Sequence, residues 1–284
     1  MLKVVILAAA QGERPGVEYP RVLQPLGDKP IINHVLNLAR QVAEPDDIHV
    51  IVGYMAGAVR EHLGPAYQYV LQEQALGTGH AVAQVASLLR DYDGDLLILY
   101  GDTPLIRSSS LRGMLLRHRL KRADLTLLAG VSRADTGLPY GRIVRDHAGC
   151  IVEVVEEADA SAAVREIREL NLGAYVARAR PLFAALDEVA RASADRGALL
   201  TDVVRVLARR PGRVTSYQSN DQDEFLGINT PENLVAAEII LQKRLLRPRR
   251  IEEENIISFG TGGWRAVIGE GFTLNNVRRL CQAL

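Results

Sequence analysis

Residues 3–14 read Lys-Val-Val-Ile-Leu-Ala-Ala-Ala-Gln-Gly-Glu-Arg, and this stretch decides the fold. The apolar run Val4–Leu7 predicts a buried strand. The alanines that follow it, and then Gly12, let another molecule approach the backbone closely. Arg14 and Arg21 come next and keep their positive charge. Small residues, free backbone N–H groups and fixed positive charge indicate a polyphosphate-binding loop. The alternative is a tight connection between a strand and a helix, with arginines that only face solvent.

Strand and helix patterns alternate after this loop. The expected strands are Ile48–Val52, Tyr67–Leu71, Leu96–Tyr100 and Leu125–Val131, and the expected helices begin at Pro30 or span His80–Leu89 and Ser109–Lys121. This alternation predicts a Rossmann-like α/β fold, with a mostly parallel sheet flanked by helices on both faces. In such sheets ligands bind beyond the carboxyl ends of the strands.

The second half of the chain has a more mixed pattern. Two short runs, Arg142–Arg145 and Ile151–Val155, predict a hairpin. A further strand is expected at Asn171–Val176, a short strand is expected to close with Gly227-Ile228-Asn229, and helices are expected at Arg178–Val189 and Thr201–Leu207. Thr230, Pro231 and Glu232 are typical of a helix start, and that helix is expected to reach about Leu246.

Composition excludes several classes of protein. The 284 residues suffice for one large domain or two modest ones, and the formal net charge is zero, which gives no sign of a nucleic-acid or membrane-surface partner. Cys150 and Cys281 exclude a disulfide framework and a cysteine-based zinc site, and they fit a reducing cytoplasm. The first apolar run is too short for a signal peptide, and no stretch approaches the roughly 20 apolar residues that span a membrane.

A second motif, Leu71–Ala81, reads Leu-Gln-Glu-Gln-Ala-Leu-Gly-Thr-Gly-His-Ala. The amide of Gln72 offers both a donor and an acceptor, which suits the imide edge of uracil. The turn formed by Gly77, Thr78 and Gly79 would let the backbone lie flat against a base. The alternative is a glycine-rich helix start, which is common in α/β proteins.

A carboxylate, Asp102, follows the predicted strand Leu96–Tyr100. Mg²⁺ prefers oxygen ligands and usually takes one or two of them from the protein. The alternative is that Asp102 only caps the next turn.

Together these motifs resemble the sugar-1-phosphate nucleotidylyltransferases. The family patterns L-A-A-G-x-G-T-R, P-K, L-Q-x-x-x-L-G-T-G-H-A and G-D-x-P-L recur here in order, and the resemblance covers roughly residues 1–245. Within the family, the uridylyltransferases that act on N-acetylglucosamine 1-phosphate are the most similar. The resemblance implies nucleotide binding by Leu7, Ala8, Ala9, Gly12, Gln72, Gly77 and Thr78, phosphate neutralisation by the catalytic residues Arg14 and Arg21, and Mg²⁺ binding by Asp102 and Asn229.

Weaker motifs resemble the sugar-binding side of the same family. They are Tyr140–Ile143, Val155–Ala160, Glu169–Gly173 and the pair Thr201-Asp202. Alone, each could be an ordinary surface segment, because carboxylates and amides are mostly exposed. Their shared order with the family implies sugar binding by Gly141, Glu156, Asn171 and Thr201.

The resemblance implies that UTP and N-acetylglucosamine 1-phosphate, or glucose 1-phosphate, give a UDP-sugar and pyrophosphate in a Mg²⁺-dependent in-line displacement. Four positions depart from the family pattern: Ala10 replaces glycine, Glu13 replaces threonine, Arg21 replaces lysine and Leu172 replaces threonine. A non-catalytic nucleotide-sugar-binding module that regulates a fused mutase therefore stays open, as do GTP or dTTP with another sugar, and a homo-oligomer.

The end of the chain departs more sharply. Residues 256–265 read Ile-Ile-Ser-Phe-Gly-Thr-Gly-Gly-Trp-Arg, which resembles the opening of phosphoglucomutases and phosphomannomutases. We therefore expect a nucleotidylyltransferase domain at 1–246, a linker at 247–254 and the truncated start of a phosphohexomutase-like domain at 255–284. The alternative is a simple C-terminal extension.

Overall fold

The computed structural model describes residues 2–10, 19–133, 139–192, 197–246 and the pairs 259–260 and 263–264. The chain divides into two compact units, Met1–Glu238 and Ile239–Leu284. In the second unit the short strands β12 (Phe259–Gly260) and β13 (Gly263–Trp264) pair antiparallel. The predicted linker lies outside the described residues, and the predicted domain limits stay a prediction.

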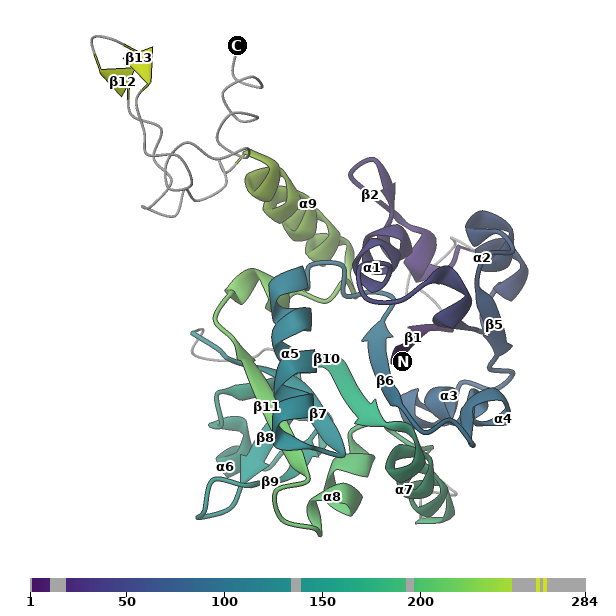
Figure 1. Cartoon of the computed structure of the whole chain (residues 1–284), viewed down its shortest axis with the longest axis vertical. Coiled ribbons are helices and arrows are strands. Elements are labelled where there is room, and N and C mark those ends of the chain that lie inside the picture. Colours follow the sequence, from purple (N-terminus) through teal and green to yellow (C-terminus); the bar gives the residue numbers. More distant parts are fainter. Residues whose placement is uncertain are drawn as a thin grey trace. The chain divides into compact units, whose positions relative to one another are not determined.

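The first unit is built on one large sheet whose strands run in the order β11-β7-β10-β6-β1-β4-β5 (Figure 1). The bounds are β1 (Leu2–Ala8), β4 (Ile48–Val52), β5 (Gln68–Leu71), β6 (Asp95–Tyr100), β7 (Leu125–Val131), β10 (Glu169–Arg178) and β11 (Val214–Ser219). All neighbours on this path are parallel except β10, which is antiparallel to both β6 and β7. The hairpin of β8 (Arg142–Arg145) and β9 (Ile151–Val155) joins the sheet at β10. The predicted mostly parallel sheet is confirmed.

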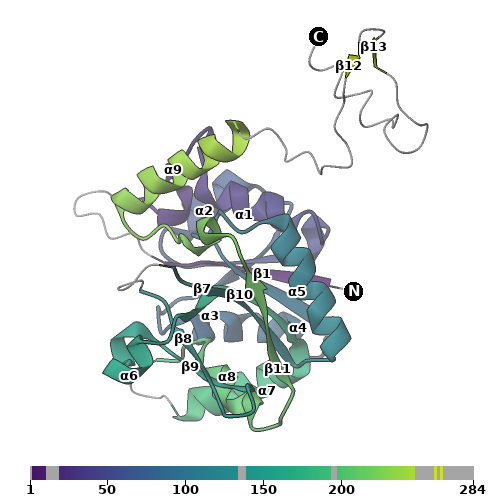
Figure 2. The same ribbon diagram turned by 90° about the vertical axis from the view of Figure 1, so that its left-hand side faces the viewer.

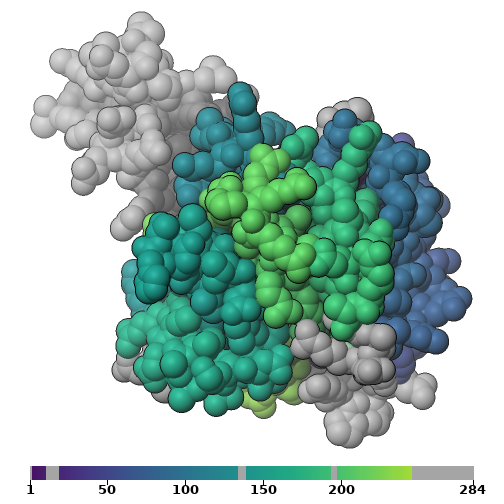
Figure 3. All heavy atoms as spheres, turned by 90° about the horizontal axis from the view of Figure 1, so that it is seen from below, coloured from purple at the N-terminus to yellow at the C-terminus, as the bar shows by residue number. Residues whose placement is uncertain are grey.

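Helices cover both faces of this sheet (Figure 2). One layer holds α1 (Ile31–Ala39), α2 (Ala56–Leu63) and α5 (Ser108–Lys121). The other holds α3 (Thr78–Gln84), α4 (Ala86–Leu89), α7 (Ala179–Ala192) and α8 (Asp202–Ala208). Figure 3 shows the outer surface of this second layer, where α7 and α8 lie side by side. The remaining described elements are β2 (Pro25–Leu26), β3 (Lys29–Pro30), α6 (Ala162–Arg165), α9 (Pro231–Leu246) and the 3-10 turns η1 (Arg21–Leu23), η2 (Pro45–Asp47), η3 (Glu157–Asp159) and η4 (Gln222–Phe225).

The apolar run of β1 serves both layers. Val4 and Ile6 are fully buried in the core shared with α1, α2 and α5, whereas Val5 is fully buried in the core shared with α3, α4 and α7. Successive side chains of a strand point to opposite faces, so a sheet covered on both sides needs a continuous apolar run. This requirement explains why the opening stretch has no polar alternation.

Two predicted elements are wrong in detail. The expected single helix at 80–89 begins earlier, at Thr78, and is interrupted at Val85. Gly227–Asn229 is a loop and not a strand, because its backbone N–H at Ile228 donates to one carbonyl, that of Asp102, at 2.9 Å and forms no ladder. The predicted start of α9 is confirmed, since Thr230 Oγ1 accepts from the backbone N–H of Asn233 at 3.3 Å.

Within the residues that the structure describes, no helix combines the length and the apolar character that crossing a membrane requires.

Candidate active site

The ends of β1 and β6 meet where the first and third motifs predicted a site. The N–H of Gly101 donates to the carbonyl of Leu7 at 2.9 Å. A Cβ at Gly101 would lie 2.8 Å from that oxygen and 3.0 Å from Val22 Cγ1, so only glycine fits without a shift. This contact places Asp102 beside the end of β1, where Ala8 is buried and Ala9 is half-buried.

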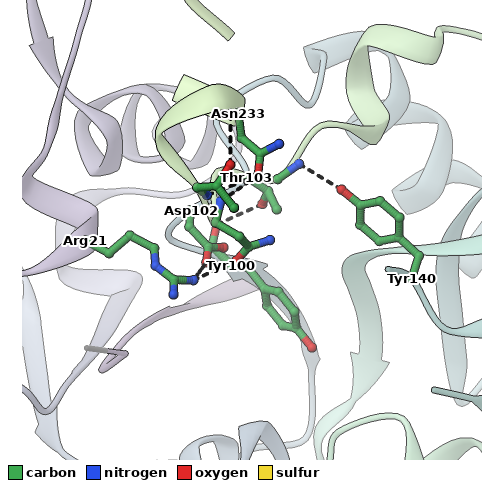
Figure 4. A network of polar contacts seen from close by, with 9 residues as sticks. Arg21, Tyr100, Asp102, Thr103, Tyr140 and Asn233 are labelled. Atoms are coloured by element: carbon green, nitrogen blue, oxygen red, sulfur yellow. Dashed lines mark hydrogen bonds and ion pairs between the residues drawn. The ribbon is translucent and has the colours of Figure 1, made fainter. Parts of the chain in front are cut away.

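Arg21, Asp102 and Asn229 come together although they are far apart in sequence (Figure 4). The Arg21 guanidinium donates through Nη1 to Asp102 Oδ2 at 3.2 Å and to Asn229 Oδ1 at 2.7 Å. The side chains of Arg21 and Asp102 are only 13% and 20% exposed. The sequence predicted all three as site residues, and the geometry places the two oxygens around one positive charge.

The electrostatics favour a further cation at this point. Burial raises the pKa of Asp102, although the nearby Arg21 guanidinium acts in the opposite direction. A carboxylate whose ionised form is disfavoured by burial gains from an added positive charge. Since Nη1 reaches both Asp102 and Asn229, a metal ion that took the place of Nη1 would touch a carboxylate and an amide oxygen, which are ligands that Mg²⁺ accepts. Among the described residues no three His, Cys, Asp or Glu side chains group together, so this pair would hold a metal that completes its shell with phosphate and water.

The loop that carries Asn229 is held by side chains that the sequence reasoning did not single out. Tyr140 Oη accepts from the N–H of Gly227 at 2.8 Å and donates to the Phe225 carbonyl. Asn233 Oδ1 accepts from the N–H groups of Asn229 and Thr230 at 3.2 and 3.1 Å. The Y-G-R-I motif contained Tyr140, but only the fold shows that it fixes this loop.

The four predicted sugar-binding residues also gather into one cluster. Thr201 donates to Glu156 Oε1 at 2.6 Å. A Cβ on Gly141 would lie 2.6 Å from Val154 Cγ1 and 3.4 Å from Glu156 Oε2. The carbonyl of Gly141 accepts from the N–H of Asn171 at 2.9 Å. Three segments, the hairpin, β10 and the start of α8, therefore present their polar groups at one place.

Two tyrosines line the strands behind this cluster. Asn171 Nδ2 donates to Tyr175 Oη at 2.7 Å, and Asn171 Oδ1 is buried with no partner in the described part of the chain. The rings of Tyr175 and Tyr100 have centroids 6.3 Å apart. Burial raises the pKa of Tyr100 to about 12, and burial raises the pKa of Tyr175 well above its usual value. Both phenols are therefore neutral near neutral pH and able to donate. The sequence reasoning missed both, since Tyr100, at the end of an apolar strand, and Tyr175, within one, resemble core residues.

The glycine-rich turn before α3 is held by a segment far away in the sequence. Gly77 has φ +95°, and a Cβ there would lie 2.4 Å from the Ala198 carbonyl oxygen. Thr78 Oγ1 accepts from the N–H of Leu200 at 2.9 Å. The glycine at 77 is thus required by protein backbone, whatever ligand it also meets. Thr78 also neighbours the Tyr100 hydroxyl, which connects this turn to the end of β6.

The positions that depart from the family pattern differ in where they lie. Leu172 is 2% exposed and packs in the core shared with α1 and α5. It therefore replaces a family threonine away from the polar cluster, on the opposite face of β10 from Asn171. Ala10 is exposed. Gly12, Glu13 and Arg14 lie outside the described residues.

Comparisons with known proteins agree with the predicted fold. The family model described as the MobA-like NTP transferase domain matches residues 4–209. A solved UDP-glucose pyrophosphorylase in complex with UDP-glucose has a TM-score of 0.71 and 18% identity, and the match covers 86% of this chain and 100% of that one. At this identity the likeness shows the fold alone, and it confirms the Rossmann-like arrangement.

Curated relatives share much more sequence. The bifunctional protein GlmU of Brevibacillus brevis is 41% identical over 245 residues, which cover 86% of this chain and 52% of that protein. GlmU of Enterococcus faecalis is 37% identical over 241 residues, which cover 85% of this chain and 52% of that protein. The chain thus spans about half the length of these relatives.

Proposed function

The chain belongs to the family of MobA-like NTP transferase domains, and from this premise we propose that it transfers a nucleotidyl group to a sugar 1-phosphate. We propose UTP as the nucleotide and N-acetylglucosamine 1-phosphate or glucose 1-phosphate as the acceptor. The products are a UDP-sugar and pyrophosphate. The proposal is supported by the shared order of the motifs and by the similarity to proteins named GlmU.

One observation carries the proposal. Arg21 Nη1 lies within hydrogen-bonding distance of both Asp102 and Asn229, which are 81 and 208 residues away along the chain. Such a group of one fixed cation and two oxygen ligands, at the carboxyl ends of parallel strands, suits a polyphosphate with its metal ion.

The reaction needs positioning and charge neutralisation more than covalent help from the protein. An oxygen of the sugar phosphate forms a bond to the α-phosphorus, the bond between the α-phosphorus and its bridging oxygen breaks, and pyrophosphate leaves. The attacking phosphate is already an anion, so no general base is required. Arg21 neutralises negative charge on the phosphates, and Arg14 is proposed to do the same. Asp102 and Asn229 would hold Mg²⁺, which supplies further charge neutralisation when it is bound.

The polar cluster orients the sugar in this proposal. Asn171 Oδ1 is a buried acceptor without a described partner, so a sugar hydroxyl that donates to it removes an unsatisfied group. Glu156 accepts in the same place, and the missing side chain of Gly141 leaves room beside it. Thr201 keeps the Glu156 carboxylate in position.

We further propose Mg²⁺ as the metal and the cytoplasm as the location. The donor pair of Asp102 and Asn229 supports the first, and the scarcity of cysteine supports the second. Light scattering would measure the molar mass in solution and so distinguish a monomer from a homo-oligomer.

The test is pyrophosphate release with Mg²⁺, across UTP, GTP, dTTP and ATP, each paired with the 1-phosphates of N-acetylglucosamine, glucose and mannose. We expect release with UTP and one of the first two sugars. Asp102→Ala is expected to lower turnover by about 100-fold or more, because it removes the carboxylate that would hold the charge-neutralising Mg²⁺. The matched control is Asp187→Ala, which breaks an exposed pair with Arg90 and should leave turnover unchanged.

If no pair of nucleotide and sugar 1-phosphate released pyrophosphate while UTP still raised the melting temperature, a catalytic role would be contradicted. It would indicate the alternative, a module that binds a nucleotide without reacting. Near wild-type turnover of Asp102→Ala would remove Asp102 from the site.

A further inference from the structure

The side-chain amide of Gln72 is held in one orientation. Gln72 follows β5 directly and is 7% exposed. Its Nε2 lies 3.2 Å from the Gly77 carbonyl oxygen. A backbone carbonyl can only accept, so the end of the amide that faces it must be the nitrogen. The Gly77 carbonyl is itself fixed, because Gly77 packs against the backbone of Ala198.

His80 takes the second hydrogen of the same nitrogen. His80 Nδ1 lies 3.0 Å from Gln72 Nε2. Since the amide nitrogen donates, Nδ1 accepts and carries no proton, and the neutral ring keeps its proton on Nε2. That Nε2 lies 3.1 Å from Gln84 Nε2, which also donates to the His80 carbonyl at 3.1 Å. Gln84 is only half-buried, so its amide can turn its oxygen toward the His80 proton and exchange that carbonyl bond for water, whereas the amide of Gln72 is buried.

Both N–H groups of the Gln72 amide are therefore used within the protein. No residue in the described part of the chain donates to Gln72 Oε1. What Gln72 can offer to a ligand is consequently an acceptor and not a donor.

We propose that His80 is a positioning residue that sets the base preference of the site by presenting the oxygen of Gln72 to the nucleotide. This rests on the proposed function, in which Gln72 reads the base. An acceptor selects bases with an N–H at the centre of their pairing edge, which are uracil, thymine and guanine. It rejects cytosine and adenine, which carry an unprotonated ring nitrogen at that position. The class of nucleotide is thus narrowed by a side chain that does not touch it.

The experiment measures dissociation constants by calorimetry for UTP, CTP, GTP and ATP with Mg²⁺. It uses the wild-type chain, His80→Leu, His80→Asn and the control His62→Leu. His62 pairs with the exposed amide of Asn33 and lies outside the site. UTP and CTP differ mainly in the donor or acceptor character of this edge, so their ratio is the readout.

We expect wild type and His62→Leu to bind UTP roughly 10- to 100-fold more tightly than CTP, the effect of facing an acceptor with another acceptor. His80→Leu should bring the ratio down by about 10-fold, because the amide of Gln72 can then turn. His80→Asn should restore it, since its Oδ1 can accept where Nδ1 did. A role confined to stability would lower the melting temperature and leave the ratio unchanged.

Equal binding of UTP and CTP by the wild-type chain, or an unchanged ratio in His80→Leu, would overturn the inference. If His80→Leu fails to fold, His80→Ala removes the same acceptor and should lower the ratio in the same way. Gln72→Met separately tests whether Gln72 reads the base, because it removes the Gln72 acceptor and should bring the ratio close to one. Failure of the proposed function is separable: UTP preference without pyrophosphate release would end that function and leave this inference in place. Pyrophosphate release from UTP and CTP alike would support the proposed function and contradict this inference.

Discussion

Gly77→Ala should destabilise the chain through two separate effects. The first is conformational, because φ at Gly77 is +95°, a region that side chains rarely adopt, at a cost of about 1–3 kcal/mol. The second is steric, because the new Cβ would lie 2.4 Å from the Ala198 carbonyl oxygen. The two backbones must separate, which weakens the hydrogen bonds from Gly79 N to the Ala198 carbonyl at 2.8 Å and from Leu200 N to Thr78 Oγ1 at 2.9 Å.

The backbone strain of about 1–3 kcal/mol and the partial loss of two hydrogen bonds of about 1 kcal/mol each give an expected loss in the free energy of unfolding of about 3 kcal/mol. For a domain of this size it corresponds to a melting temperature lower by roughly 6–12 °C. Differential scanning fluorimetry and urea unfolding measure both quantities.

The matched control is Gly57→Ala. Gly57 is exposed within α2, and a Cβ there meets no atom within 4 Å. This substitution should stabilise by roughly 0.5–1 kcal/mol, since alanine is the better helix former. A Gly77→Ala variant that melts within about 2 °C of wild type would refute the reasoning, because neither strain nor overlap would then be real.

Three further predictions follow from charged groups. Mg²⁺ should raise the melting temperature more at neutral than at acid pH, because burial raises the pKa of Asp102 and protons then compete with the metal for this carboxylate. If Mg²⁺ raised the melting temperature of Asp102→Asn as much as that of wild type, this prediction would be contradicted. By itself, that raised pKa favours the folded state at low pH, a contribution lost as pH rises through the folded pKa. Glu224→Gln should lower the free energy of unfolding, measured in urea, by roughly 2–4 kcal/mol, because the buried carboxylate accepts from one N–H and two hydroxyls. A decrease of less than about 1 kcal/mol would refute a stabilising role for these three hydrogen bonds. His118 Nε2 lies 3.5 Å from Asp95 Oδ1 and lowers the pKa of that carboxyl. The contribution of Asp95 to stability is therefore present above its unfolded pKa and is lost as pH falls through its folded pKa, so Asp95→Asn should flatten the acid side of a plot of melting temperature against pH.

Much of the fold could be predicted because its signals are local. The continuous apolar run Val4–Leu7 indicated a strand covered on both faces, and β1 packs in both cores. The direction of β10 could not be predicted, because side chains alternate between the two faces in the same way in parallel and antiparallel strands. The prediction that a strand closes at Gly227–Asn229 was wrong, because this segment makes one long-range backbone hydrogen bond, to the Asp102 carbonyl, and no ladder. The sequence pattern does not distinguish such a contact from strand pairing.

The candidate site was predicted in outline by the order of its motifs. Asp102 and Asn229 were paired in advance, and the structure places both against Arg21. Their roles in binding stay predictions. Tyr140 and Tyr175 could not be recognised, because their partners are a loop backbone and an amide that only the tertiary fold brings near.

The antiparallel strand β10 also bears on how the chain is made. Strands β1, β4, β5 and β6 can pair as soon as β6 ends at Tyr100, but β10, the other neighbour of β6, is complete only at Arg178. At typical rates of synthesis that gap of roughly 80 residues lasts about 4–16 s. During this time the open edge of β6 is an unpaired, apolar strand, the kind of edge that recruits other chains. The nascent first half is therefore where we expect chaperones to act on this protein.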